Sequence, residues 1–208
     1  MIIGITGGIG SGKSVIAKQL HKMGYSVYDT DSEAKRIIVE DATVREQMTA
    51  LFGEDVYKDG VYQTALVAQQ VFADKNLLAK LNAIVHPAVK QDIITKFRSL
   101  EVTFEPSAPS EPLKRNSGLF FIECAILFQA GFDVLCDKVV AVTAPEDIRL
   151  ERVIARDHSD MNKVRARMRA QEAERDIERA DIVINNDGTT PIPTLCEEII
   201  LQLKKEQR

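Results

Sequence analysis

The residues of this chain best suited to chemistry form one stretch near its start, residues 7–14, with the sequence GGIGSGKS. This glycine loop fits the pattern G-x-x-x-x-G-K-[ST] without a mismatch. Its glycines would allow backbone N–H groups to surround the oxygens of a phosphate, because no Cβ stands in the way. Lys13 would reach the β- and γ-phosphates of a nucleotide, and the hydroxyl of Ser14 would bind Mg²⁺. The pattern therefore predicts a site for a nucleoside triphosphate.

The segments on either side of the glycine loop support the same interpretation. Residues 1–6 form a short apolar run, which is typical of a buried strand. Residues 15–23 have the spacing of a helix, and its predicted inward face consists of Val15, Ile16, Leu20 and Met23. A helix N-terminus offers unpaired N–H groups and a dipole that favours an anion. The alternative is a plain glycine-rich turn, which the order strand, loop, helix disfavours.

Two carboxylates lie at the end of the next predicted strand, residues 25–29. Asp29 is its last residue, and Asp31 stands at the start of a helix predicted to run through Ile38, with Thr30 or Asp31 as its N-cap. In open α/β sheets the ligand crevice lies at the carboxyl ends of the strands. Asp31 is therefore an ordinary cap or a catalytic carboxylate, and the two roles are compatible because both need an exposed anion at a helix start.

A third carboxylate, Glu123, follows the apolar strand predicted over residues 119–122. A carboxylate in this place suits the orientation of Mg²⁺ through a bound water, and the alternative is a solvated charge at the end of a strand. Further apolar runs at residues 138–142 and 180–185 complete five predicted parallel strands, since strands that are buried on both faces form continuous apolar segments.

Residues 42–100 separate the second and third of these strands and are mostly helical by pattern. The predicted elements are helices at residues 44–52, 66–72, 77–85 and 87–97, with a turn at Asp59-Gly60. His86-Pro87 is predicted to end one helix and begin the next, because the residue before a proline avoids the helical region. The block is too long for a simple crossover, which indicates an inserted lobe for a second substrate, with added scaffolding as the alternative. Residues 101–117, with three prolines, are predicted to form a surface loop.

An arginine-rich segment, residues 145–175, separates the fourth and fifth strands. Pro145 is predicted to open a helix, with Thr143 as its candidate cap. One face of that helix carries Arg149, Arg152 and Arg156. Because guanidinium groups fork onto phosphate oxygens, this pattern indicates a helical hairpin that closes as a lid over the transferred phosphoryl group. A helix pair held by salt bridges is the alternative.

The composition is that of a soluble globular protein. The chain has 208 residues, of which 45% are hydrophobic and 28% charged, and this suits one domain with a sizeable core. The net charge of −4 disfavours general binding to nucleic acids or membrane surfaces. The three scattered cysteines, Cys124, Cys136 and Cys196, predict reduced thiols and a cytoplasmic protein.

Taken together, these stretches resemble the dephospho-coenzyme A kinase family over nearly the whole chain. The matching segments are residues 4–14, 29–35, 84–89, 149–157, 167–171 and 180–188, of which the first and last are the most specific. The chain departs from the family's D-x-P-L-L-F-E after the third strand. Glu123 keeps the carboxylate there, but Ala125 and Gln129 replace the proline and the acid, and Lys35 stands where arginine is usual.

The resemblance implies a P-loop kinase fold, in which a five-stranded parallel sheet is flanked by helices within an α/β unit. An inserted helical substrate lobe and an arginine-rich helical lid complete the unit, which would span residues 1–208. Its core would comprise about residues 1–30, 118–144 and 176–208, the acceptor-substrate lobe about 31–102, and the lid about 145–175. The implied activity is ATP-dependent phosphorylation of the ribose 3′-hydroxyl of dephospho-CoA, which gives CoA and ADP in the last step of CoA synthesis.

The resemblance also implies a role for each candidate residue. Asp31 would take the proton of the acceptor hydroxyl, and lid arginines would stabilise the moving phosphoryl group. The implied catalytic residues are thus Lys13, Asp31, Arg152, Arg156 and Arg167. The implied ATP-binding residues are Gly8, Ile9, Gly10, Ser11, Gly12, Lys13, Ser14, Val15 and Asn185, the last of them near the adenine. Ser14 and Glu123 are the implied Mg²⁺ ligands.

Two other functions share part of this pattern. Another kinase of small molecules or nucleoside monophosphates would have the same sheet and lid but a different lobe at residues 42–100. A GTP-dependent switch would carry an N-K-x-D motif that reads guanine, and the chain lacks this motif. The resemblance therefore implies a kinase whose small-molecule partners are ATP and dephospho-CoA.

Overall fold

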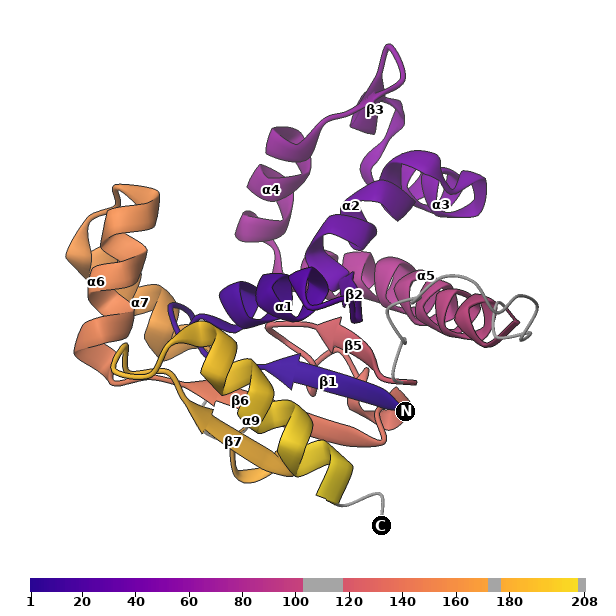
Figure 1. Cartoon of the computed structure of the whole chain (residues 1–208). Helices are drawn as coiled ribbons and strands as arrows, with labels where there is room; N and C mark the ends of the chain where they lie inside the picture. The colour runs from indigo at the N-terminus through magenta and orange to yellow at the C-terminus, as the bar shows by residue number, and fades with distance from the viewer. Residues whose placement is uncertain (103–117, 172–176, 206–208) are drawn as a thin grey trace. The chain divides into compact units, whose positions relative to one another are not determined.

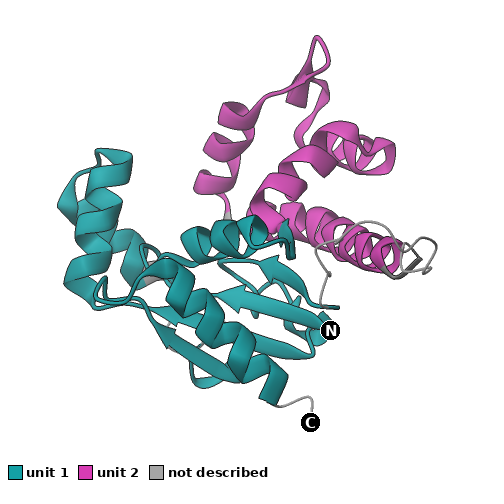
Figure 2. Ribbon diagram, viewed as in Figure 1, with its two compact units in different colours: residues 1–28, 108–208 teal, residues 29–107 magenta. Residues whose placement is uncertain are grey.

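The computed structural model describes residues 1–102, 118–171 and 177–205. The chain divides into two compact units, shown in Figure 2. The first comprises residues 1–28 and 108–208, and the second residues 29–107. Each unit is described by itself below.

The first unit is built on the predicted five-stranded sheet, which the structure confirms (Figure 1). Its strands are β1 (Ile2–Thr6), β2 (Ser26–Asp29), β5 (Phe120–Glu123), β6 (Lys138–Thr143) and β7 (Ile182–Asn185), in the order β2-β5-β1-β6-β7. The central strand β1 pairs in parallel with β5 and β6, and β6 pairs in parallel with β7. The carboxyl end of β1 therefore leads into the glycine loop in the middle of the sheet.

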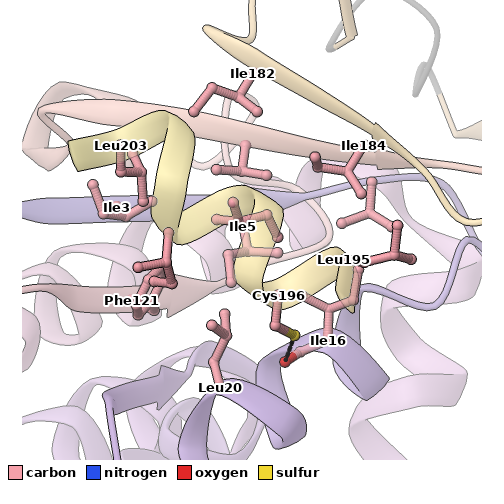
Figure 3. Packing of buried hydrophobic residues seen from close by; sticks show 14 of the residues in the cluster. Ile3, Ile5, Ile16, Leu20, Phe121, Ile182, Ile184, Leu195, Cys196 and Leu203 are labelled. Atoms are coloured by element: carbon pink, nitrogen blue, oxygen red, sulfur yellow. Dashed lines mark hydrogen bonds between the residues drawn. The ribbon is translucent and has the colours of Figure 1, made fainter. Parts of the chain in front are cut away.

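Helices α1 (Lys13–Lys22) and α9 (Ile192–Lys205) pack against one face of this sheet and close the main core (Figure 3). Alternate residues of the strands, such as Ile3, Ile5 and Phe121, are fully buried in it. The thiol of Cys196 donates a hydrogen bond to the carbonyl oxygen of Ile16 at 3.7 Å, which links the two helices, and burial raises the pKa of this thiol to about 11. The packing of α1 against the sheet and α9 thus fixes the position of the helix start that follows the glycine loop.

One detail of the predicted α1 is wrong. The buried residues of this helix are Ile16, Ala17 and Leu20, whereas Val15 is 52% exposed and Met23 is 36% exposed. Successive residues of a helix differ by about 100° in direction, so a face centred on Ile16 and Leu20 turns Val15 outward. Met23 is the C-cap and lies beyond the last turn.

Two further helices, α6 (Glu146–Asp157) and α7 (Met161–Ala170), form the arginine-rich hairpin of the first unit. They enclose a small core of Leu150, Val153, Val164 and Met168, against which Ile9 of the glycine loop packs. Thr143 is not the cap of α6, contrary to prediction. It is the last residue of β6, paired with Asn185, and its hydroxyl donates to the carbonyl oxygen of Ile184 at 3.3 Å, so Pro145 takes the N-cap position.

The second unit is mostly helical. Its elements are α2 (Thr30–Glu40), α3 (Ala42–Phe52), η1 (Glu54–Val56), β3 (Tyr57–Lys58), β4 (Val61–Tyr62), α4 (Thr64–Ala73) and α5 (Lys75–Val102). The predicted turn at Asp59-Gly60 joins β3 to β4, and both residues have a positive φ. Arg36 on α2 donates hydrogen bonds to Glu33 at 2.6 Å and to Asp92 of α5 at 2.9 Å, which fixes α2 against α5.

The predicted helix break at His86-Pro87 is wrong, because α5 runs without interruption through Pro87. A proline removes one backbone donor from a helix and is locally unfavourable. On both sides of Pro87, however, the helix buries apolar side chains, namely Val85, Val89 and Ile93, and it packs against α2, α3 and α4. This packing outweighs the local cost. Residues 103–117, most of the predicted surface loop, lie outside the described residues, while Glu101 and Val102 belong to α5.

Within the described ranges, no helix is both long and apolar enough to cross a membrane.

Candidate active site

The glycine loop leaves the start of α1 open to an anion. Gly12 is the N-cap of α1 with a φ of 92°, and no side chain accepts a hydrogen bond from the first turn. Among the described residues, none accepts a hydrogen bond from the backbone N–H of Gly10, Gly12, Lys13 or Ser14. These N–H groups lie at the positive end of the helix dipole. Their natural partner is an oxygen anion such as a phosphate.

A carboxylate from the neighbouring strand reaches the same place. Glu123, the last residue of β5, accepts a hydrogen bond from the hydroxyl of Ser14 at 3.0 Å, and the Nζ of Lys13 lies 3.5 Å from the same carboxylate oxygen. The side chain of Glu123 is only 7% exposed, so the alternative of a solvated charge at the strand end is wrong. Burial of this charge is offset by polar neighbours, which include Ser14 and Lys13.

These residues suit a magnesium ion. The Ser14 hydroxyl and the Glu123 carboxylate offer oxygen donors, which Mg²⁺ prefers, and the ion usually takes only one or two protein ligands beside water and phosphate oxygens. The described residues contain no group of three or more His, Cys, Asp or Glu side chains that could hold a metal by themselves. The donor set therefore fits an ion that arrives together with a nucleotide.

Asn186 stabilises the glycine loop through a side-chain hydrogen bond, a role that the sequence did not indicate. Its Nδ2 donates to the carbonyl oxygen of Ser11 at 2.8 Å, and a Cβ on Gly12 would lie 2.2 Å from that nitrogen. Asn186 is 3% exposed and continues the alternation of β7, in which Ile182 and Ile184 point inward. That two-residue period was the available signal for it.

Asn185, which the resemblance places near the adenine, is exposed and turned the other way. Its Nδ2 donates to the carboxylate of Asp187 at 3.1 Å, within the turn that follows β7. The hydroxyl and N–H groups of Thr189, and then Asn185, hold the pKa of Asp187 below its usual value. Asn185 thus forms part of an ordered surface turn.

The three candidate arginines of the hairpin have different surroundings. Arg152 lies against the glycine loop, where it donates to the carbonyl oxygen of Asn186 at 3.0 Å. Arg156 and Arg167 are 64% and 52% exposed and both bind the carboxylate of Asp157, at 2.6 Å and 3.2 Å. These hydrogen bonds, chiefly from Arg156, lower the pKa of Asp157 to about 2. The structure therefore brings one of the three to the loop and engages the other two in a surface ion pair.

The first turn of α6 lies directly on the loop. A Cβ on Gly10, whose φ is 81°, would stand 2.4 Å from the carbonyl oxygen of Arg149, so only glycine permits this approach. The Nε of Arg149 is buried without a hydrogen-bond partner among the described residues. The arginine hairpin and the phosphate site are thus adjoining parts of one unit.

In the second unit, the start of α2 is capped by Asp29. Its Oδ1 accepts hydrogen bonds from the N–H groups of Asp31 at 3.1 Å and Ser32 at 3.2 Å, and its Oδ2 accepts one from the Ser32 hydroxyl at 2.9 Å. The prediction that Thr30 or Asp31 is the cap is therefore wrong, because Asp29 is the residue with extended backbone before the first turn. Asp31 is exposed, and no described residue donates a hydrogen bond to its carboxylate.

Gln171, the C-cap of α7, is a second residue to which the sequence assigned no role. Its Oε1 accepts a hydrogen bond from the backbone N–H of Ile9 at 2.7 Å, and its Nε2 donates to the carbonyl oxygen of Ala125 at 3.2 Å. It thus connects the hairpin with the glycine loop and with the segment after Glu123. The signal for it was its place in the matching segment 167–171.

Comparison with known proteins gives a consistent result. The family model described as dephospho-CoA kinase matches residues 1–191. A dephospho-CoA kinase of Porphyromonas gingivalis is 43% identical over 178 residues, which cover 86% of this chain and 81% of that protein. A solved structure from Thermus thermophilus is 31% identical, with a TM-score of 0.77 and coverage of 98% and 97%. A dephospho-CoA kinase from Campylobacter jejuni, 22% identical with a TM-score of 0.68 and coverage of 100% and 98%, shares the fold.

Proposed function

Since this chain belongs to the dephospho-CoA kinase family, we propose that it transfers the γ-phosphoryl group of ATP to the ribose 3′-hydroxyl of dephospho-CoA, giving CoA and ADP. One observation carries the proposal from the family to this chain. The open start of α1 has both a cation, Lys13, and a hydroxyl–carboxylate pair, Ser14 and Glu123, within 3.5 Å. Such a group serves to bind and activate a triphosphate.

The chemistry needs little beyond positioning and charge. The 3′-oxygen forms a bond to the γ-phosphorus as the bond from that phosphorus to the bridging oxygen of ADP breaks. Lys13 and the free N–H groups of the loop would bind the phosphate oxygens and disperse the negative charge that ADP acquires. Ser14 and Glu123 would hold Mg²⁺, and the ion would supply further neutralisation of the phosphate charge.

Asp31 and Arg152 complete the proposed machinery. Asp31 would orient the 3′-hydroxyl and accept its proton, and its carboxylate has no competing donor among the described residues. Arg152 would stabilise the moving phosphoryl group, and Asn186 holds its guanidinium beside the loop. Arg156 and Arg167 would contribute only after exchanging Asp157 for a phosphate oxygen. Asn185 would contact the adenine.

The second unit, residues 29–107, would supply most of the acceptor site, since the predicted acceptor-substrate lobe of residues 31–102 falls within it. We also infer a cytoplasmic enzyme. All three cysteines are thiols and not disulfides, and burial raises the pKa of the Cys136 thiol to about 12, which disfavours its reactive thiolate form. Such cysteines suit a reducing compartment.

The test is a coupled assay of ADP release by the purified protein with dephospho-CoA, AMP, CMP, shikimate or water as acceptor. We expect turnover with dephospho-CoA and a product that carries one additional phosphoryl group on its 3′-oxygen, as measured by mass spectrometry. A mock purification from cells that do not express the protein measures contaminating kinases. Equal turnover with AMP or shikimate would contradict the assignment and favour another small-molecule kinase.

A further inference from the structure

The side-chain amide of Gln171 lies between two segments of the phosphate site. On one side its Oε1 accepts a hydrogen bond from Ile9 in the glycine loop at 2.7 Å, and on the other its Nε2 donates to Ala125 at 3.2 Å. All three residues belong to the first unit. Only one orientation of the amide satisfies both contacts, because the backbone N–H of Ile9 needs an acceptor and the carbonyl of Ala125 needs a donor.

Ile9 is held at two points by the arginine hairpin. Its N–H group is bound by Gln171 at the end of α7, and its side chain packs against the small core between α6 and α7. The N–H of Ile9 is therefore directed away from the phosphate position, while the N–H groups of Gly10, Gly12, Lys13 and Ser14 remain available. Gln171 thus withdraws the N–H of Ile9 from the groups that the loop can offer a ligand.

The second contact of Gln171 acts on the metal side of the site. Ala125 is two residues after Glu123, whose carboxylate accepts the hydrogen bond from Ser14. β5 ends at Glu123, and the chain continues into turns from Ala125 onward. A fixed carbonyl at Ala125 therefore limits how far Glu123 can move relative to the glycine loop.

From these contacts we propose that Gln171 is a positioning residue of the phosphate site. It sets the distance between the glycine loop and the carboxyl end of β5, so that the free N–H groups and the Glu123 carboxylate both meet the phosphates of Mg-ATP. The proposal rests on the proposed function only for the use of ATP. It does not depend on the identity of the acceptor.

The first test compares Gln171→Leu with the wild type by isothermal titration calorimetry of Mg-ATP binding in the absence of acceptor. Leucine fills a similar volume but makes neither hydrogen bond, so the dissociation constant should rise about tenfold, the effect of about one lost hydrogen bond on a binding group. The matched control is Gln202→Leu on α9, since among the described residues the amide of Gln202 donates to Glu198 one helical turn away, at 3.0 Å, and not to the phosphate site. The control should leave the dissociation constant unchanged.

The second test uses Gln171→Glu and its dependence on pH. A protonated carboxyl group has one donor and one acceptor, as the amide has, whereas a carboxylate can only accept. Because the carbonyl oxygen of Ala125 repels a carboxylate, the pKa of the new side chain should lie above its usual value of about 4.3. Mg-ATP affinity of this variant, expressed relative to the wild type at each pH, should therefore be lowered at pH 8 and begin to recover as the pH falls towards 5. Such a recovery would show that protonation of the new side chain restores the contact with Ala125 in the same variant.

The outcomes separate positioning from simple structural support. If Gln171 only stabilises the fold, both Gln171 variants should have a lower melting temperature and a dissociation constant for Mg-ATP within twofold of the wild type. That result would overturn the proposal. Failure of the wild type to phosphorylate dephospho-CoA would contradict the proposed function, and Mg-ATP binding would still decide the role of Gln171. Loss of the folded state in Gln171→Leu leaves Gln171→Glu at low pH as the deciding variant.

Discussion

The helices α1 and α2 both follow strands of the same sheet, but they differ in whether a side chain of the protein binds the first backbone N–H groups. At α1 the N-cap is Gly12, which has no side chain, and the first N–H groups are left without a partner among the described residues. At α2 the N-cap is Asp29, whose carboxylate binds the N–H groups of Asp31 and Ser32. The start of α1 is therefore open to an external anion, whereas the start of α2 is capped by the carboxylate of Asp29.

The charges at the two helix starts differ in the same sense. The open start carries a cation, Lys13, although the helix dipole disfavours a positive charge there, so the site is arranged for an anion that comes from outside. The capped start carries Asp31 and Glu33 in its first turn, where the dipole favours negative charge. The comparison suggests a division of labour in which α1 binds phosphate and α2 presents a carboxylate to the acceptor.

Asp31→Asn is expected to have the largest effect on this division. The change removes the proposed base while Asp29 keeps the cap, so turnover should fall by about two to four orders of magnitude, the usual contribution of a positioned acid or base. The melting temperature and the dissociation constant for Mg-ATP should stay close to those of the wild type. Stopped assays of CoA formation together with a melting curve measure both. Unchanged turnover would contradict the role of Asp31 and move the base to Asp29.

Lys13→Ala should come next, because it removes the cation from the open start. The loss of charge stabilisation on the transferred group should lower kcat/KM by about two to three orders of magnitude, as for other preorganised electrostatic contacts. Glu123 keeps the hydrogen bond from Ser14, so the fold should survive. Steady-state kinetics and circular dichroism are the measurements. Near-normal turnover would contradict the phosphate site.

The sequence predicted the open start well, because its signals are local. A complete glycine motif, the apolar run before it and the helical spacing after it identify strand, loop and helix without knowledge of any distant contact. Glu123 was predicted for a similar reason, since a carboxylate directly after a buried strand lies at the edge of the sheet where ligands bind. Its distance of 3.0 Å from the Ser14 hydroxyl, however, depends on the pairing of β1 with β5.

The features that the sequence did not give depend on contacts between distant segments. The continuity of α5 through Pro87 is decided by packing that no local pattern contains. The roles of Asn186 and Gln171 arise because β7 and α7 meet the glycine loop across more than 150 positions of sequence, 175 between Asn186 and Ser11 and 162 between Gln171 and Ile9. The spacing that placed three arginines on one helix face could not show which of them binds the carboxylate of Asp157.

A smaller effect is expected from replacing two of the hairpin arginines one at a time. Arg152→Leu removes a guanidinium held beside the open start, and kcat should fall about tenfold to a hundredfold, the range for a lost hydrogen bond to a charged group. Arg156→Leu removes one side of an exposed ion pair and should change kcat by less than about threefold. Steady-state kinetics at saturating ATP decide between them, and equal losses in the two variants would indicate that the hairpin rearranges during the reaction.

The smallest effect concerns the cap of α2 itself. Asp29→Ala leaves the N–H groups of Asp31 and Ser32 without an acceptor, so the free energy of unfolding should fall by about 1 kcal/mol. Asp29→Asn should restore most of this loss, because asparagine caps about as well as aspartate. Asp41→Ala is the matched control, since Asp41 caps α3 by accepting a hydrogen bond from the N–H of Val44 at 2.9 Å.

Urea titrations of the three variants measure the stabilities, and a CoA-formation assay on the same samples measures turnover. If the cap of α2 only closes a helix, Asp29→Ala and Asp41→Ala should lose similar stability and keep similar turnover. If the cap also holds the first turn so that Asp31 points at the acceptor, Asp29→Ala should lose several-fold more turnover than Asp41→Ala at equal loss of stability, and Asp29→Asn should recover it. A loss of turnover in Asp29→Asn as large as that expected for Asp31→Asn would show that the carboxylate at the capped start, and not the one beside it, takes the proton.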